Sequence, residues 1–230
     1  PTIIVIPMSF SESQYLEFPP KEWSLRWYNE YWETPRWINA TITSLKVAFF
    51  TMLLATPFGT MAAYGLYVSG SRLGKFVFFL LMTPMIIPVI LIAIGTFYVF
   101  GKVGIVNSIP GLVLAHTVLA IPIVMIIMTS ALRTYDLNQE LVARSLGASR
   151  VRAFFQITLP QIKFSVIISA LFAFLTSFDE VIISIFLSGG GNSTLTKQMF
   201  NALRDYIDPT IAAISTLMII LSTTLMLGAQ

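Results

Sequence analysis

The sequence predicts an all-α integral membrane protein with about six membrane-spanning helices. Hydrophobic residues make up 56% of the 230 residues and charged residues only 11%. A soluble domain usually has about 25% charged residues, and a chain of this size cannot bury so much apolar surface in its own core. The apolar residues also gather in long runs, without the alternation typical of outer-membrane barrels. We therefore expect residues 1–230 to form one domain that is solvated by lipid.

The apolar runs define the expected spans, because a helix needs about 20 apolar residues to cross a bilayer. The chain opens inside a shorter run, Pro1–Phe10, which we expect to be the outer end of a first spanning helix whose start precedes this sequence. The other expected spans are Leu45–Val68, Phe76–Phe100, Ile109–Leu132, Phe164–Leu187 and Thr210–Gln230.

Prolines interrupt several of these runs, at positions 57, 84, 88 and 122. Each proline removes a backbone donor and clashes with the preceding turn, so we expect bends there. Pro84 and Pro88 are only four residues apart. Inside a bilayer the freed carbonyls need partners from protein or from a water-filled path, so these two prolines indicate either a packing kink or the lining of a pathway.

The distribution of basic residues predicts the orientation. Arg72 and Lys75 lie in a short connection without acidic residues, and the polar insert Arg133–Lys163 is also net basic. Both connections fall on one side if the spans alternate, and the positive-inside rule makes that side cytoplasmic. The stretch Glu12–Arg36, which is rich in Glu, Trp and Tyr, then lies outside, where we expect a short helix on the membrane surface.

The insert itself reads as two short helices joined by a glycine corner. Asp136 and Gln139 resemble a capping arrangement at the start of the first helix, and Gly147 is placed to end it. Ser149 can cap the second helix, and Pro160 then opens the next span.

The first helix of the insert is amphipathic. Glu140 and Arg144 lie four residues apart and are expected to pair on its polar face. Such a helix can lie on lipid or dock into a groove on another protein. Its apolar arc comprises Leu137, Leu141, Val142 and Leu146.

Two adjacent carboxylates, Asp179 and Glu180, fall within the run Phe164–Leu187. A charge at such depth costs about 2.5–3.5 kcal/mol on insertion scales, so it normally faces a bundle interior or a water-filled cavity. We expect these residues either to hold the bundle together or to attract a cationic solute as it crosses.

Several kinds of chemistry are excluded or disfavoured by composition. The chain has no cysteine, and His116 is the only histidine, so neither a Cys site nor a His-cluster metal site can form. His116 is expected to be a packed, hydrogen-bonded residue. A net charge of +3 without a basic tract gives no indication of nucleic-acid binding. The phosphate-binding motif G-x-x-x-x-G-K-[ST] does not occur, so any ATP chemistry is expected in a partner.

The stretch ELVARSLGASRVRAFFQITLP, residues 140–160, resembles the cytoplasmic signature of binding-protein-dependent ABC importer permeases. That signature is Glu-Ala-Ala, three residues, Gly, eleven residues and an apolar–Pro pair. The family glutamate is replaced by Leu141, with Glu140 one place earlier, and Val142 replaces a small residue. The matching residues are Ala143, Leu146, Gly147, Ala148, Leu159 and Pro160. Residues 9–33, 177–200 and 208–217 also resemble segments of the polyamine-type branch.

The resemblance implies a permease subunit of a type I importer in the bacterial cytoplasmic membrane, with residues 12–36 periplasmic. It implies as partners a second permease, two ATPase subunits that bind ATP and magnesium, and an extracytoplasmic solute-binding protein. The path for a small organic solute, such as a polyamine, would include Phe178, Asp179, Glu180, Pro84 and Pro88. The ATPase-coupling residues would be Leu137, Glu140, Leu141, Ala143, Arg144, Leu146, Gly147 and Ala148.

Two other classes of membrane protein would use the carboxylates of Asp179 and Glu180. An intramembrane enzyme would employ Asp179, Glu180 and His116 in acid–base work. A secondary transporter would employ the carboxylates as a proton site driven by an ion gradient. An importer permease is distinguished from both because it co-purifies with an ATPase.

Overall fold

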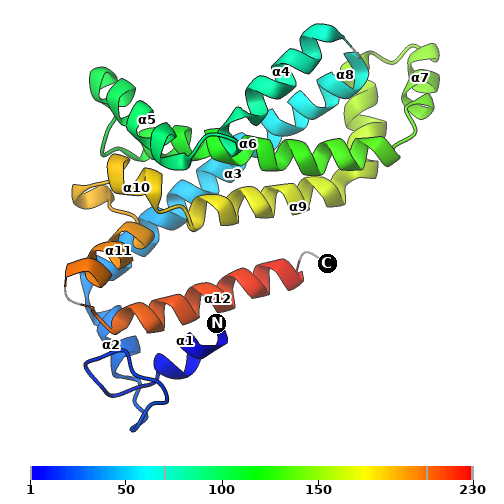
Figure 1. The fold of residues 1–230 in the computed structure, drawn as a ribbon. Coiled ribbons are helices and arrows are strands. Elements are labelled where there is room, and N and C mark those ends of the chain that lie inside the picture. The colour runs from blue at the N-terminus through cyan, green and yellow to red at the C-terminus, as the bar shows by residue number, and fades with distance from the viewer. Residues whose placement is uncertain (1, 70, 206, 229–230) are drawn as a thin grey trace.

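A computed structural model describes residues 2–69, 71–205 and 207–228, and in these ranges the regular structure is helical apart from one isolated bridge between Ser11 and Trp23. Figure 1 shows the arrangement. A 3₁₀ turn, Thr83–Met85, precedes α5, and a π-helical turn, Phe154–Thr158, joins α8 to α9. The helices are α1 (Thr2–Met8), α2 (Arg26–Glu33), α3 (Pro35–Ser69), α4 (Arg72–Met82), α5 (Val89–Val103), α6 (Ile109–Thr134), α7 (Asn138–Ser145), α8 (Arg150–Ala153), α9 (Leu159–Phe178), α10 (Ile182–Leu187), α11 (Leu195–Asp205) and α12 (Thr210–Gly228).

The helices α3, α6 and α9 lie side by side and form the centre of the fold (Figure 1). Small side chains make this close packing possible, since transmembrane helices attract one another mainly through van der Waals contact and need backbones that approach closely. The buried stripe on α3 recurs every three or four residues and comprises Ser44, Ala48, Thr51, Ala55, Gly59 and Ala63. Larger side chains of α6, among them Val124 and Met128, fill the space opposite it.

In the described ranges, four helices are long and apolar enough to cross a membrane, namely α3, α6, α12 and the continuous stretch Arg150–Phe178. A fifth candidate consists of two pieces, Arg72–Met85 and Val89–Val103. The all-helical membrane fold predicted from the sequence is therefore confirmed, while the sixth span stays a prediction.

The predicted span Phe76–Phe100 is wrong as a single helix, because its two pieces are bent by 100° relative to each other. Pro84 lies within the 3₁₀ turn and Pro88 directly precedes α5. Neither proline has a backbone N–H, so the helical hydrogen-bond ladder cannot continue through this stretch. Two prolines four residues apart therefore break the span where a single proline would only have kinked it.

The predicted span Phe164–Leu187 is also wrong at its C-terminal end. The helix α9 ends at Phe178, and a separate short helix, α10, begins at Ile182. Asp179 and Glu180 thus lie in the break between two helices and not in the middle of one. The predicted span Leu45–Val68 begins too late, because α3 starts at Pro35, ten residues before Leu45.

The aromatic segment near the N-terminus forms the predicted short helix, α2. Trp27 and Tyr31 are buried, whereas Trp23 and Trp32 are 67% and 64% exposed. The helix α2 packs against α12 and α3, and α1 packs along α12 (Figure 1). An ion pair of 3.8 Å between Arg36 and Asp208 links the start of α3 to the connection that precedes α12. The last two residues of the predicted span Thr210–Gln230 lie outside the described residues.

The small-residue stripe can be tested at Gly59. A Cβ atom at this position would lie 2.6 Å from Cγ1 and 2.8 Å from Cβ of Val124, whereas at Gly65 of the same helix nothing lies within 4 Å. We expect Gly59→Ala to lower the free energy of unfolding by about 1–3 kcal/mol through overpacking. Gly65→Ala, the matched control, should leave the apparent melting temperature of the purified protein unchanged or higher. Equal melting temperatures for the two variants would contradict a close contact between α3 and α6.

Candidate functional site

The polar insert begins with the helix α7. The Asp136 carboxylate accepts a hydrogen bond from the backbone N–H of Asn138 at 3.0 Å, which satisfies one of the free donors at this helix start. The other half of the predicted capping arrangement is wrong. The Gln139 side chain accepts a hydrogen bond from the Gln161 amide at the start of α9 instead of turning back to its own helix.

The glycine corner predicted at Gly147 is confirmed. Gly147 has φ +94°, in the left-handed region that a residue with a side chain adopts only at a cost. Its N–H donates to the Arg144 carbonyl at 3.0 Å, and the N–H of Ala148 donates to the Ala143 carbonyl at 3.1 Å. These two bonds are the Schellman pattern that ends a helix. Ser149 then caps α8 by accepting from the Arg152 N–H at 3.3 Å.

The apolar arc of α7 divides between two faces. Leu137 packs against the buried cluster at this end of the bundle. Leu141, Val142 and Leu146 are 45%, 60% and 84% exposed and face away from the bundle. Of the other predicted coupling residues, Arg144 and Gly147 are exposed, while Ala143 and Ala148 are half-buried. The insert therefore presents an apolar surface that no described part of the chain covers.

Glu140 does not pair with Arg144, and this prediction is wrong. Its side chain is 1% exposed and points into the bundle. One carboxylate oxygen accepts a hydrogen bond from the Tyr64 hydroxyl of α3 at 2.7 Å, and the other accepts from the Thr158 hydroxyl at 3.0 Å. These bonds join the insert to α3 and to the start of α9. The helical spacing within the insert predicts neither contact.

The adjacent carboxylates at the end of α9 have different environments. Asp179 is exposed and its N–H continues the last turn of α9 by donating to the Leu175 carbonyl. Glu180 is half-buried, and its side chain accepts a hydrogen bond from the Ile183 N–H at 2.7 Å. Glu180 therefore caps α10, whereas the Asp179 carboxylate is available to a solute.

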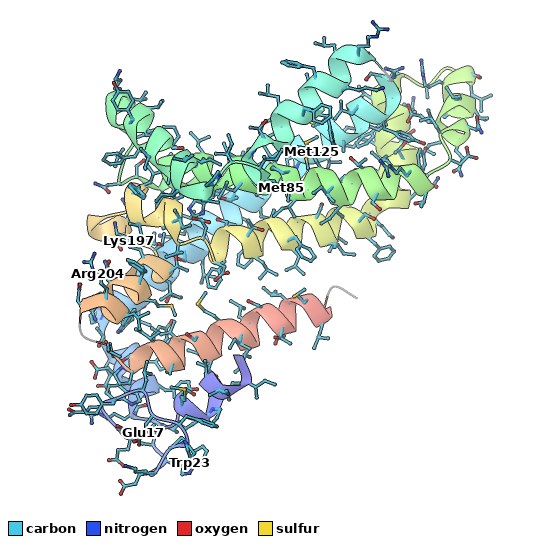
Figure 2. The ribbon with its side chains drawn as sticks, in the orientation of Figure 1. Glu17, Trp23, Met85, Met125, Lys197 and Arg204 are labelled. Atoms are coloured by element: carbon cyan, nitrogen blue, oxygen red, sulfur yellow. The ribbon has the colours of Figure 1, made fainter. Side chains whose placement is uncertain are left out.

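Two hollows meet at Glu180. The larger has a volume of about 740 Å³ and lies between the end of α9 and the middle of α12, where Phe178, Asp179 and Glu180 contribute to its wall. The smaller has a volume of about 450 Å³ and is lined by the bend between α4 and α5, including Pro84 and Pro88, and by Glu180. Met85, which also lines it, lies over α6 (Figure 2). The structure thus brings together the predicted path residues from distant parts of the sequence.

The contribution of α12 to the larger hollow was not predicted from the sequence. Met218, Ile219, Ser222 and Thr223 line it opposite the carboxylates. The run of hydroxyl residues from 222 to 224 inside an apolar span was the signal that could have identified this face. Phe178 lines the hollow only in part, since it is 3% exposed and its ring stacks on Phe174 with the centroids 5.7 Å apart.

His116 is packed and hydrogen-bonded, as predicted. It is 1% exposed, and its Nδ1 lies 2.8 Å from the Ser177 hydroxyl. Its Nε2 lies 3.4 Å from the hydroxyl of Ser184, which donates to the Glu180 carbonyl. The histidine therefore fastens α6 to both sides of the break that carries the carboxylates.

The helix α11 lies at the end of the molecule away from α7, and Figure 2 shows Lys197 and Arg204 on it. The Lys197 ammonium donates to the Ser188 carbonyl at the end of α10, and burial lowers its pKa. The loop that contains Asn192 is held by a 2.8 Å hydrogen bond from the Asn192 amide to the Asn107 carbonyl. These bonds position the segment that follows α10.

Comparison with known families identifies the chain. The family described as "Binding-protein-dependent transport system inner membrane component" matches residues 55–230, which include the insert and the carboxylates. The chain belongs to this family. The resemblance seen in residues 140–160 is thus confirmed, and the protein is an inner-membrane transport component rather than an enzyme.

Known permease proteins are similar to this chain over most of their length. The spermidine/putrescine transport system permease protein PotC of Haemophilus influenzae is 32% identical over all of this chain and 89% of its own length. The putrescine permease PotI of Escherichia coli is 30% identical over 95% of this chain and 80% of its own. The molybdenum permease ModB of Mycobacterium bovis is 28% identical over 85% of this chain and 79% of its own.

Solved structures share the fold. One is a bacterial ABC transporter involved in the import of the acidic polysaccharide alginate, with a TM-score of 0.77, 13% identity, and coverage of 99% of this chain and 86% of that chain. Another is the alginate transporter in complex with a periplasmic protein that holds an alginate pentasaccharide. It has a TM-score of 0.72 and 15% identity, and the match covers 90% of this chain and 81% of that chain. At such low identity these matches concern the fold alone.

Proposed function

We propose that this chain is one of two permease subunits of an ATP-driven importer that moves a small organic cation, such as a polyamine, into the cell by alternating access. The family membership and the whole-length similarity to polyamine permeases support this assignment. The observation that carries it is the insert, in which a capped helix fixed to the bundle presents exposed Leu141, Val142 and Leu146 outside the candidate spans. Such a surface fits a groove on an ATPase subunit.

In this proposal ATP and magnesium bind in two partner ATPase subunits, and α7 is the coupling helix. ATP binding favours one of two packings of the permease pair, because the ATPase subunits contact α7 differently with and without bound ATP. A solute-binding protein delivers the cargo at the opposite end of the bundle.

The direct test is purification of the chain from its native membrane. An ATPase should co-purify with it, and proteoliposomes of the complex should take up solute only with ATP. Uptake by the chain alone along an ion gradient would favour a secondary transporter.

The proposal includes an orientation. The basic stretches Arg72–Lys75 and Arg133–Lys163 face the cytoplasm, and Glu12–Arg36 faces the periplasm. The arrangement supports this, since α7 and the start of α4 lie at one end of the bundle and α2 and α11 at the other (Figure 1). Because the chain has no native cysteine, a Ser149→Cys variant can be labelled without background. Labelling of this site from outside intact cells would contradict the orientation.

Gly147 provides a test of coupling. A side chain at φ +94° strains the corner, so Gly147→Val should tilt α7 against the ATPase and lower transport per ATP hydrolysed by about tenfold. Gly147→Asn should be milder, because asparagine tolerates the left-handed conformation. Gly101→Val is the matched control, since Gly101 is helical, exposed and without atoms within 4 Å of its Cβ position. Wild-type transport per ATP in Gly147→Val would count against α7 as the coupling helix.

The cargo can be tested at the two carboxylates. A cation that crosses an apolar path needs a counter-charge, since an unpaired buried charge is costly. Asp179→Asn should therefore lower uptake of labelled putrescine by about tenfold at low substrate concentration, which corresponds to the loss of one charged hydrogen bond. Glu180→Gln keeps an oxygen to cap α10 and should have a smaller effect. The control Asp205→Asn removes an exposed charge on α11 that pairs with Arg204. If Asp179→Asn and Asp205→Asn behave alike, Asp179 is not the counter-charge.

A further inference from the structure

The buried carboxylate of Glu140 lies where three separate parts of the chain meet. It belongs to α7, its partner Tyr64 to α3, and its partner Thr158 to the π-helical turn before α9. Glu140 and Thr158 are 1% and 0% exposed. These hydrogen bonds join residues 76 and 18 positions apart along the chain.

The bonds form a directed chain. Thr158 donates its only hydroxyl proton to Glu140, so the Tyr135 hydroxyl, 3.0 Å away, must donate to Thr158. Burial raises the pKa of Tyr135, which keeps its phenol protonated and able to donate. The Tyr67 hydroxyl in turn donates to the Tyr135 carbonyl at 3.1 Å. Tyr64 and Tyr67 of α3 therefore hold both ends of the same network.

A carboxylate here is costly unless donors reach both of its oxygens. The ion pairs of the described residues, Arg36–Asp208 and Arg204–Asp205, do not include Glu140. Its hydrogen-bond partners are two hydroxyls on different elements, so a displacement of α7 relative to either element lengthens at least one of these bonds. Apolar packing tolerates small displacements, whereas directed bonds to a buried charge define one geometry.

The π-helical turn contributes to this contact at both of its ends. Thr158 is its last residue, and Phe154, its first, packs its ring against that of Tyr64 with centroids 4.6 Å apart. Such turns are rare and occur frequently at functional sites. The network therefore ties α3 to both ends of the turn through which α8 continues into α9.

We propose that Glu140 is a positioning residue that locks α7 to the cytoplasmic ends of α3 and α9, so that movement of α7 displaces both helices as one body. The inference rests on the proposed function for the source of that movement. It assigns to Glu140 a contact within the permease, in place of the contact with an ATPase that the family resemblance implied. Without the lock, α7 would move on its own and the π-helical turn would absorb the displacement.

The test measures the position of α7 directly. Spin labels at Ser69→Cys, on the exposed end of α3, and Ser145→Cys, on the exposed end of α7, report their separation in the full complex. We expect one narrow distance distribution in the otherwise unchanged chain. Glu140→Leu should broaden it and lower transport per ATP by about tenfold, as expected for the loss of hydrogen bonds to a charge. Glu140→Gln, which can exchange hydrogen bonds with both hydroxyls, should restore the narrow distribution and most of the transport.

Tyr64→Phe and Thr158→Val each remove one donor with little change in shape, and they carry the test if Glu140→Leu fails to assemble. Each should broaden the distribution, whereas Tyr98→Phe, a control at an exposed tyrosine of α5, should not. An unchanged distribution in Glu140→Leu, or in both Tyr64→Phe and Thr158→Val, would overturn the proposal. A melting temperature that falls in Glu140→Leu and stays equally low in Glu140→Gln would also overturn the proposal. The same distance measurement on the purified full-length chain alone needs neither transport nor an ATPase, so it tests the contact even if the importer assignment fails.

Discussion

The backbone's need for internal hydrogen bonds in lipid governs this structure. A peptide group in hydrocarbon has no water to bond, so the chain must stay helical wherever it faces lipid. Each departure from helical geometry has to be covered by protein. The small-residue stripe of α3 meets this requirement at the centre of the molecule, because it lets α3, α6 and α9 pack closely enough to shield one another.

The interruptions of the helices gather in two places. The bend at Pro84–Pro88 and the break at Asp179–Glu180 both border the hollows next to α12 and α6. The π-helical turn and the glycine corner lie together at the end that carries the insert. Regular helix between these regions gives a stiff connection from one to the other. Polar side chains thus gather where the backbone hydrogen bonds of a helix are interrupted and where neighbouring helices supply the missing partners.

Buried polar side chains hold both regions by the same means. His116 ties α6 to Ser177 and Ser184 on the two sides of the carboxylate break. Glu140 ties α7 to Tyr64 and Thr158 around the π-helical turn. In each case a buried group that needs more than one partner fixes elements that apolar contacts alone would leave free to slide. Each of these groups therefore fixes the relative position of the elements that it joins.

The sequence by itself determined the membrane class, most of the long helices, the glycine corner and the family. Length, hydropathy and the backbone freedom of glycine act locally, so they can be read from neighbouring residues. Only the tertiary structure decided that α9 ends at Phe178, that two prolines divide one span, and that Ser222 and Thr223 face the carboxylates. It also turned Glu140 inward, away from the Arg144 that its helical spacing had suggested. That choice depends on hydroxyls 76 and 18 residues away, and no local pattern contains them.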